Sequence, residues 1–323
     1  MKIAILGLGA YGIALAKAFY ENDNKVSMWT KYKEEADIVL LKRENINVLP
    51  SIKIPKEIEI TTQLEKCMEK ARIIVLAVPM SAVREVSKEI SKYLTCEQVI
   101  CIVSKGIEQN SNMLMSDVVY EETKSEKICM LSGPSFAMDL VKENEVGLVV
   151  ASNLTEAQMS IKVCLENERI IINTTRDIRG VQVAAATKNV FAILCGMLDG
   201  MKKSESTKAA VLSCLCNDLR IIIEVLGGKP QTIFSYAGIG DLLLTCMSKK
   251  SRNYTFGKYI GEGKSIDEAL EKMQTKTVEG LYTLDSLKKL LEKIEIKVES
   301  VELLYKIIYE GYKVDNILKS IKR

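Results

Sequence analysis

The sequence predicts an α/β N-terminal domain with a mostly parallel, doubly wound sheet, followed by an all-α C-terminal domain. Two observations lead to this prediction. Short apolar runs typical of strands alternate with helical patterns through the first half of the chain. After about residue 177 the strand-like runs stop, and only helical periodicity remains. We therefore expect one domain over residues 1–177 and a second over 178–323.

The expected strands are nearly continuous apolar runs, which indicates burial on both faces, as in parallel sheets. They cover residues 2–6, 25–29, 73–79, 99–103, 127–131, 147–151 and 169–174. Helical patterns lie between most of them, at 11–20, 82–94, 112–122, 136–142 and 156–166. Two long helices, 177–201 and 206–226, open the second half, and Gly227-Gly228-Lys229-Pro230 ends the latter.

Composition narrows the class of protein. A chain of 323 residues exceeds what one hydrophobic core usually supports. The net charge of +3 is too small to indicate a nucleic acid or a membrane surface as partner. Nine cysteines without a CxxC pair indicate free thiols in a reducing compartment. The chain starts at Met1 directly with a strand and has no uninterrupted apolar run of membrane-spanning length, so we expect a cytoplasmic protein.

Histidine is absent from the sequence. Any proton transfer must therefore use Lys, Asp, Glu, Tyr or Cys. Dehydrogenase mechanisms based on histidine, Ser-His or Cys-His nucleophile pairs and histidine-rich metal sites are excluded, and we expect no metal site.

A glycine-rich turn follows the first strand and opens the first helix. Gly7, Gly9 and Gly12 form the GxGxxG pattern in the context that a Rossmann dinucleotide site requires. Gly7 permits the tight turn, Gly9 lets the backbone approach a pyrophosphate, and Gly12 allows close packing of helix and strand. A structural turn without a ligand is the alternative. We interpret the turn as the binding site of a nicotinamide dinucleotide.

The second strand ends without the acidic residue that usually holds the ribose 2′-hydroxyl of NAD. Glu34 and Glu35 come only later in the sequence. Lys31 could instead meet a 2′-phosphate, although a solvated lysine is an equal alternative. The cofactor is therefore expected to be NADPH or NADH, with NADPH favoured.

Polar residues follow two further strands, at the edge of the sheet where ligands of open α/β sheets bind. Lys105 stands at the tip of one strand and suits an anionic substrate or a polarised oxygen, the alternative being a surface lysine. Gly133 and Ser135 follow the next strand and offer a backbone and a hydroxyl donor. An ordinary helix N-cap is compatible with the same two residues.

Lys188 stands in a helical stretch, 183–198, that is otherwise almost entirely apolar. A helix that is apolar on all sides is buried, and burial lowers the pKa of a lysine. Such a lysine can act as a general acid or base. The alternative is a lysine at a domain edge whose ammonium reaches solvent.

Asp241 is similarly polar among apolar neighbours and could hold the charge and orientation of Lys188, although an N-cap after Gly240 is a competing interpretation. Ser251, Arg252 and Asn253 could bind a phosphate through the arginine fork and two hydrogen-bonding side chains. Taken alone, these residues would favour a basic surface loop.

At this point the chain resembles the bacterial NAD(P)-dependent glycerol-3-phosphate dehydrogenases. The motifs that carry the resemblance, in chain order, are GLGAYGIALA, VLP, LAVP, SKGI, LSGPSFA, ATKNV, GIGDLLLTC, SRN followed by FG, VEG and IYEG. The resemblance implies interconversion of dihydroxyacetone phosphate and sn-glycerol 3-phosphate, feeding phospholipid synthesis. It allows a homodimer.

The family's pattern assigns roles to individual residues. It implies that Lys188 is the proton donor or acceptor at the C2 oxygen and that Lys105 and Asp241 complete the catalytic site. The residues implied for substrate binding are Lys105, Gly133, Ser135, Asn189, Thr245, Ser251, Arg252 and Asn253. Besides the three glycines, those implied for cofactor contact are Ala10, Tyr11, Lys31, Lys105, Ala137, Arg252, Thr277 and Glu279.

The chain departs from the family around the lysine helix. Gln182 replaces a usual Glu, and Ala184-Ala185-Ala186 replaces Gly-Gly-Ala. The loop 202–207 and the stretch 213–215 also differ, and a Pro is missing near Val146. Two alternatives therefore stay open: a reductase of another phosphorylated or anionic carbonyl compound, and a non-catalytic paralogue that only binds dinucleotide.

Overall fold

The computed structural model describes residues 1–142, 144–275 and 277–321. The chain forms two compact units, one of Met1–Ser104 with Met115–Ile178 and one of Lys105–Leu114 with Arg179–Arg323. The segment Lys105–Leu114 thus belongs to the helical unit, whereas the sequence placed it in the N-terminal domain. The reason is that Ile107 and Leu114 are buried in the hydrophobic core of that second unit.

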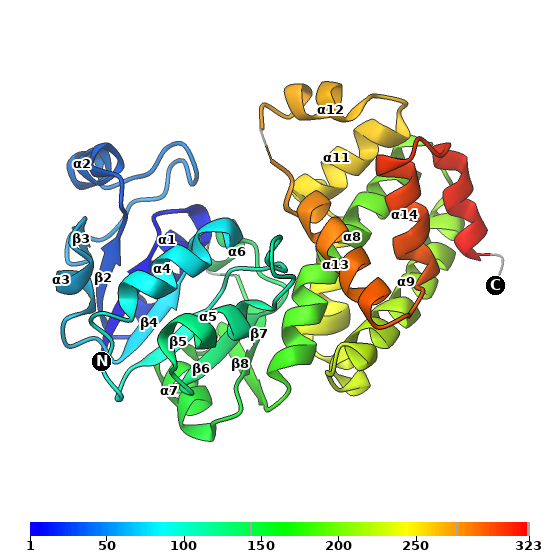
Figure 1. Ribbon diagram of the computed structural model, residues 1–323. Helices are drawn as coiled ribbons and strands as arrows, with labels where there is room; N and C mark the ends of the chain where they lie inside the picture. Colours follow the sequence, from blue (N-terminus) through cyan, green and yellow to red (C-terminus); the bar gives the residue numbers. More distant parts are fainter. Residues whose placement is uncertain (143, 276, 322–323) are drawn as a thin grey trace. The chain divides into compact units, whose positions relative to one another are not determined.

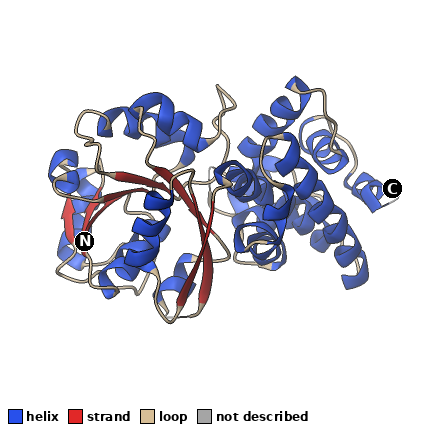
Figure 2. Cartoon of the chain, turned by 90° about the horizontal axis from the view of Figure 1, so that it is seen from below, coloured by secondary structure: helices blue, strands red, loops and turns tan. Residues whose placement is uncertain are grey.

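The first unit is an eight-stranded sheet with the order β3-β2-β1-β4-β5-β6-β7-β8 (Figures 1 and 2). Among the strand pairs of the described residues, β6 with β7 is antiparallel and the others are parallel. The strands are β1 (Lys2–Leu6), β2 (Lys25–Trp29), β3 (Glu59–Thr61), β4 (Ile73–Leu76), β5 (Val99–Ile102), β6 (Ile128–Ser132), β7 (Val146–Ala151) and β8 (Ile170–Thr175). The predicted mostly parallel α/β architecture is confirmed.

Helices cover both faces of this sheet (Figure 2). They are α1 (Ala10–Glu21), α2 (Lys33–Lys42), α3 (Leu64–Met68), α4 (Val83–Ile90), α5 (Met115–Thr123), α6 (Ala137–Val141) and α7 (Thr155–Leu165), with a 3₁₀ turn η1 (Met80–Ala82) before α4. The strand order reverses at β1, because Ile3 pairs with Val26 of β2 on one side and with Ile73 of β4 on the other. Such a switch point opens a ligand crevice at the carboxyl ends of the strands.

The elements β3, α2 and α3 are absent from the sequence prediction. β3 has only three residues, and its sequence Glu-Ile-Thr carries a single apolar side chain. The edge strand β8 alternates instead of being continuously buried, and Ile171 is 49% exposed. Edge strands have one open side, so their sequence carries less of the signal that identifies central strands.

The second unit is helical and is built around α8 (Figure 1). Its helices are α8 (Ile178–Gly200), α9 (Glu205–Val225), α10 (Asp241–Met247), α11 (Arg252–Gly261), α12 (Ile266–Lys272), α13 (Glu279–Lys293) and α14 (Glu299–Tyr309), with shorter turns η2 (Pro230–Phe234), η3 (Tyr236–Gly240) and η4 (Val314–Ile321). Within the described residues, α8 is the one helix long and apolar enough to cross a membrane, but its apolar window is entirely buried inside the protein. A core helix has the same composition.

Helices α8 and α11 meet at their backbones. A Cβ added at Gly196 of α8 would lie 2.0 Å from the Tyr254 carbonyl oxygen, and one at Gly257 of α11 would lie 1.9 Å from the Ile193 carbonyl oxygen. One helical turn further on, Gly200 and Gly261 make equally close approaches. Both helices therefore carry a Gly-x-x-x-Gly face that permits contact without intervening side chains.

Candidate active site

The glycine turn of the first unit has two glycines that the fold itself requires. Gly7 has a φ of +123°, and a Cβ there would lie 2.4 Å from the Ala77 carbonyl oxygen. A Cβ at Gly12 would lie 2.5 Å from the Gly7 carbonyl oxygen. These contacts fit the predicted roles of a tight turn and of close helix–strand packing.

Gly9 differs from these two glycines. A Cβ built on it meets no protein atom within 4 Å, and its backbone is extended, with φ of −71° and ψ of 169°. Nothing in the fold therefore requires glycine at this position, which is the N-cap of α1. The open space beside a helix N-terminus fits a pyrophosphate that approaches the backbone closely.

We expect Gly9→Ala to weaken binding of NADH or NADPH by about tenfold or more, because the added methyl occupies the path of the pyrophosphate. The free energy of unfolding should stay within about 0.5 kcal/mol of wild type, because the fold leaves room for the methyl. Fluorescence titration of the cofactor and urea denaturation measure the two quantities. Unchanged cofactor affinity would contradict the assigned role of the turn.

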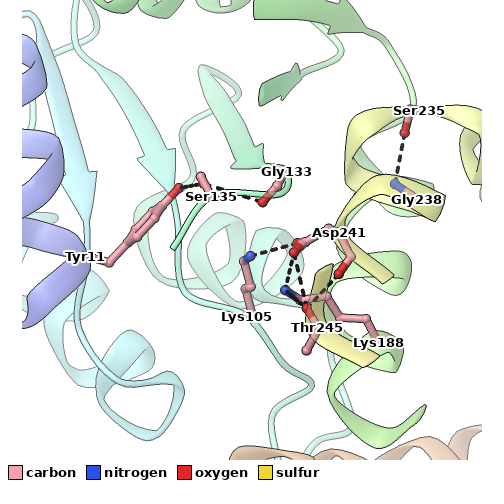
Figure 3. A network of polar contacts seen from close by, with 9 residues as sticks. All are labelled: Tyr11, Lys105, Gly133, Ser135, Lys188, Ser235, Gly238, Asp241 and Thr245. Carbon is pink, nitrogen blue, oxygen red and sulfur yellow. Dashed lines mark hydrogen bonds and ion pairs between the residues drawn. The ribbon is translucent and has the colours of Figure 1, made fainter. Parts of the chain in front are cut away.

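Other residues expected at the cofactor lie in the same unit. Tyr11, in the first turn of α1, places its hydroxyl oxygen 2.9 Å from Ser135 Oγ (Figure 3). Ala10 begins α1 and Ala137 begins α6, and both are half-buried. Lys31 lies on the surface, with 46% of its side chain exposed and its Nζ 3.5 Å from Glu85 Oε2.

Gly133 and Ser135 follow β6 as expected. Gly133 has a φ of +153°, and a Cβ there would lie 2.5 Å from the Gly147 carbonyl oxygen of β7. The Ser135 backbone N–H donates to the Gly133 carbonyl oxygen at 2.9 Å. Ser135 is not the N-cap of α6, since Phe136 takes that position. Its buried hydroxyl is paired with Tyr11 instead.

The second unit brings together three charged groups that the sequence singled out (Figure 3). Lys188 Nζ lies 2.5 Å from Asp241 Oδ1, and Lys105 Nζ lies 2.9 Å from Asp241 Oδ2. The exposed fractions of the side chains are 8% for Lys188, 17% for Lys105 and 2% for Asp241. Two lysines thus share one buried carboxylate, which leaves an excess positive charge where an anionic substrate or a developing oxyanion would be stabilised.

Local structure explains why Asp241 faces the lysines. It is the first residue of α10, directly after the π-helical turn η3 and its kink at Gly238. Ser235 caps that turn by accepting from the Gly238 N–H at 3.2 Å. No side chain caps α10 itself, so the carboxylate of Asp241 is available for the lysines rather than for the helix end.

Thr245 completes this cluster from the next turn of α10. Its Oγ1 accepts from Lys188 Nζ at 3.0 Å and donates to the Asp241 carbonyl oxygen at 2.6 Å. Lys188 Nζ is thus held by two acceptors, and the hydrogen that remains on the ammonium is available for a substrate oxygen.

The pKa values of the cluster follow from its burial and charges. Burial, helped by the neighbouring Lys105, lowers the pKa of Lys188 to about 8, although Asp241 acts in the opposite direction. Burial alone would raise the pKa of Asp241, but Lys105 and Lys188 outweigh it and hold this pKa below its usual value. Asp241 is therefore ionised at neutral pH, and Lys188 is close to the pH range in which it can both give and take a proton.

The segment expected to bind phosphate forms the start of α11. Ser251 is its N-cap and accepts from the Tyr254 N–H at 3.3 Å. Asn253 is buried, and its Oδ1 accepts from the Gly280 N–H at 2.9 Å. A Cβ at Gly280 would lie 2.7 Å from the Asn189 carbonyl oxygen, so this segment packs beside the residue next to Lys188. The helix N-terminus is a suitable anion site at that position.

The remaining expected cofactor residues lie close to this segment. Arg252 has a side chain that is 65% exposed, and its Nη2 lies 3.8 Å from Glu279 Oε1 at the start of α13. Thr277 precedes Glu279 and is exposed. Asn189 is buried beside Lys188 on α8. The structure therefore gathers the expected residues in two groups, one in each unit.

The departures that the sequence shows lie in different surroundings, some buried in α8 and others in an exposed loop. Ala184, Ala185 and Ala186 are all fully buried in α8. In the altered loop 202–207, Ser204 caps α9 by accepting from the Thr207 N–H at 3.2 Å. The alanines thus belong to a regular helix, and Ser204 caps the next one; Lys188 contacts Asp241 and Thr245 in their presence.

Comparison with known proteins shows the family of the chain. A family model described as the N-terminus of NAD-dependent glycerol-3-phosphate dehydrogenase matches residues 2–158, and the model of the C-terminus matches residues 177–319. The chain belongs to the NAD-dependent glycerol-3-phosphate dehydrogenase family. This confirms the resemblance found in the sequence.

Individual members of the glycerol-3-phosphate dehydrogenase family match over almost their whole length. A protein of Pelotomaculum thermopropionicum named glycerol-3-phosphate dehydrogenase (NAD(P)+) is 34% identical over 313 residues, covering 96% of this chain and 89% of the relative. The protein of that name from Fusobacterium nucleatum is 32% identical, covering 96% and 93%. The crystal structure of the Coxiella burnetii enzyme superposes with a TM-score of 0.93 at 28% identity, covering 100% of this chain and 98% of the other.

Proposed function

We propose that the protein reduces dihydroxyacetone phosphate to sn-glycerol 3-phosphate with NADH or NADPH, reversibly, and so supplies glycerophospholipid synthesis. The observation that carries the proposal is the buried cluster in which Lys188 and Lys105 share Asp241. The cluster provides Lys188, whose pKa is lowered, together with the positive charge of Lys105. The chain contains no histidine that could transfer the proton instead.

In this mechanism Lys188 acts as general acid. Reduction adds a hydride to the C2 carbon of the ketone and a proton to its oxygen. The ammonium of Lys188 donates that proton, and the neutral amine stays held by Asp241 and Thr245. In the reverse direction the neutral amine takes the proton from the C2 hydroxyl.

Lys105 retains its positive charge through the cycle and stabilises negative charge that develops on the C2 oxygen. Asp241 orients both ammonium groups, because each of its carboxylate oxygens faces one of them. The carboxylate itself is already paired twice and does not need to exchange a proton.

The phosphate is expected at the start of α11. Ser251 and Asn253 hold the helix N-terminus in place. Arg252 makes only a long ion pair, in which its Nη2 lies 3.8 Å from Glu279 Oε1. A guanidinium in this position can rotate to bind phosphate oxygens. The bulk of the substrate is thereby placed beside Lys188 on the adjoining helix.

The dinucleotide is expected at the turn of Gly7, Gly9 and Gly12, and when bound it supplies the hydride. The protein contributes the backbone of Gly9 and the N-terminus of α1, which face the pyrophosphate.

The wild-type reaction is tested directly by following cofactor oxidation at 340 nm with dihydroxyacetone phosphate. Turnover supports the proposal. If the protein binds NADH or NADPH without oxidising it with this substrate, the proposal fails. A panel of other phosphorylated or anionic carbonyl compounds then separates a different reductase from a paralogue that only binds dinucleotide.

The two reaction directions should depend on pH in opposite ways. Reduction needs the protonated amine of Lys188, whose pKa is lowered to about 8, so kcat/KM for the ketone should fall as pH rises through about 8. Oxidation of glycerol 3-phosphate needs the neutral amine and should become faster over the same range. Initial rates in both directions from pH 6 to 10 measure this.

If the rates of reduction and of oxidation changed in the same direction as pH rises, the assignment of Lys188 would be contradicted. The observed pKa belongs to the cluster of Lys188, Asp241 and Lys105 as a whole, since the three groups interact strongly.

We further propose that the enzyme works in the cytoplasm, without nucleic acid or membrane as partner, and that it forms a homodimer. The low net charge and the family membership support this proposal. Light scattering of the purified protein measures the assembly, and a monomer at micromolar concentration would rule out the dimer.

A further inference from the structure

A carboxylate that the catalytic cluster does not use is fixed near the glycine turn of the first unit. Glu35, in the first turn of α2, accepts at Oε2 from Thr30 Oγ1 at 2.6 Å. Its Oε1 accepts from Asn45 Nδ2 at 3.1 Å, and the same Nδ2 also donates to the Leu8 carbonyl oxygen at 3.0 Å. Asn45 therefore joins the carboxylate to the backbone of the glycine turn.

This carboxylate lies at the carboxyl end of β2. Thr30 directly follows the last residue of that strand, Trp29, whose carbonyl oxygen accepts from the Gly7 N–H at 2.8 Å. In a Rossmann domain an acidic group at this place hydrogen-bonds the adenosine ribose of the cofactor, whereas a cationic group accommodates a 2′-phosphate. The acid is missing from the strand itself, and the fold supplies one from the following helix.

We propose that Glu35 recognises the adenosine ribose 2′-hydroxyl and gives the enzyme a preference for NADH over NADPH. The inference rests on the proposed binding of a nicotinamide dinucleotide at the glycine turn. A carboxylate has about four acceptor positions, so Glu35 can accept from a ribose hydroxyl in addition to Thr30 and Asn45. A 2′-phosphate would bring a second anion against a carboxylate that two hydrogen bonds prevent from turning away.

Burial supports a fixed rather than a mobile carboxylate. Thr30 and Asn45 are 4% and 5% exposed, and Glu35 itself is half-buried. Lys31, on which the expectation of NADPH rested, is 46% exposed in its side chain, and its Nζ is 3.5 Å from the acidic Glu85. The Lys31 ammonium is thus loosely held and already lies beside an acid, whereas the Glu35 carboxylate is anchored to the glycine turn.

The test uses fragments of the cofactor that lack nicotinamide, so that it does not depend on catalysis. Isothermal titration calorimetry measures the affinity of the full-length protein for ADP and for 2′,5′-ADP. The variant is Glu35→Gln, which keeps the size and one acceptor but removes the charge. The matched control is Glu34→Gln, because Glu34 is an exposed acid on the same helical turn and the net charge changes equally.

We expect wild type to bind ADP at least about tenfold more tightly than 2′,5′-ADP, and Glu35→Gln to narrow this ratio by about tenfold. Glu34→Gln should leave the ratio unchanged. The inference is overturned if wild type binds 2′,5′-ADP as well as ADP, or if both glutamate variants change the ratio equally. Selective fragment binding without turnover of dihydroxyacetone phosphate would refute the proposed reaction and leave the inference standing.

Discussion

Replacing Lys188 by alanine should reduce kcat for dihydroxyacetone phosphate at least about 100-fold, as expected for removal of a general acid. The ammonium of Lys188 is suited to donate the proton because burial lowers its pKa to about 8, whereas Asp241 is held ionised and has no proton to give. Oxidation of NADH at 340 nm measures the loss. Affinity for the cofactor alone should not change, since the glycine turn belongs to other elements.

Two additions make this experiment specific. A small primary amine such as ethylamine should restore part of the activity of Lys188→Ala, because it can occupy the vacated space and donate the proton. Lys293→Ala serves as control, since Lys293 is an exposed residue at the end of α13. Residual activity within about threefold of wild type in Lys188→Ala would remove Lys188 from the mechanism.

Asp241→Asn should lower the free energy of unfolding by about 3–5 kcal/mol and abolish most activity. The substitution leaves the buried ammonium of Lys188 and the half-buried one of Lys105 without their shared carboxylate, and removal of one partner from a buried ion pair typically has an effect of this size. Without the attraction of Asp241, the pKa of Lys188 should fall further, so that the lysine is neutral in the working range. Urea denaturation and the pH profile of the remaining activity measure both effects.

A surface aspartate provides the comparison for Asp241. Asp285 Oδ2 lies 2.7 Å from Lys289 Nζ on the same helix, and their side chains are 28% and 51% exposed. Asp285→Asn should lower the free energy of unfolding by no more than about 0.5 kcal/mol, since exposed pairs of this kind contribute little. If both variants lost equally little stability, the lysines of the cluster could not both be charged in the folded protein.

The features that the sequence predicts well are local in character. The glycine turn follows a strand and precedes a helix, so pattern and context lie within one short segment. Lys188 stands out because the helix around it is apolar apart from Thr187 and Asn189, which indicates burial without knowledge of the partner. Both α8 and α9 could be delimited to within one or two residues of their observed ends for the same reason.

The features that the sequence does not reveal depend on contacts between distant segments. Nothing near Lys105 indicates that its segment leaves the sheet and joins the helical core, since only the burial of Ile107 and Leu114 decides this. Glu35 stands beyond the end of β2, where the sequence pattern gives no reason to expect an acid that binds the ribose. Its position beside the glycine turn results from helix α2, whose apolar residues do not gather on one buried face because Ile38, Leu40 and Leu41 are exposed. Asn45, further along the chain, completes the arrangement.

The close contact of α8 with α11 sets the tolerance of the active site to sequence change. Lys188 and the cap residue Ser251 belong to two helices that touch through main-chain atoms at Gly196 and Gly257. The spacing between Lys188 and Ser251 then depends on the backbones of the two helices and not on the rotamers of the surrounding side chains. A single methyl at either glycine would meet the main chain of the opposite helix and change that spacing.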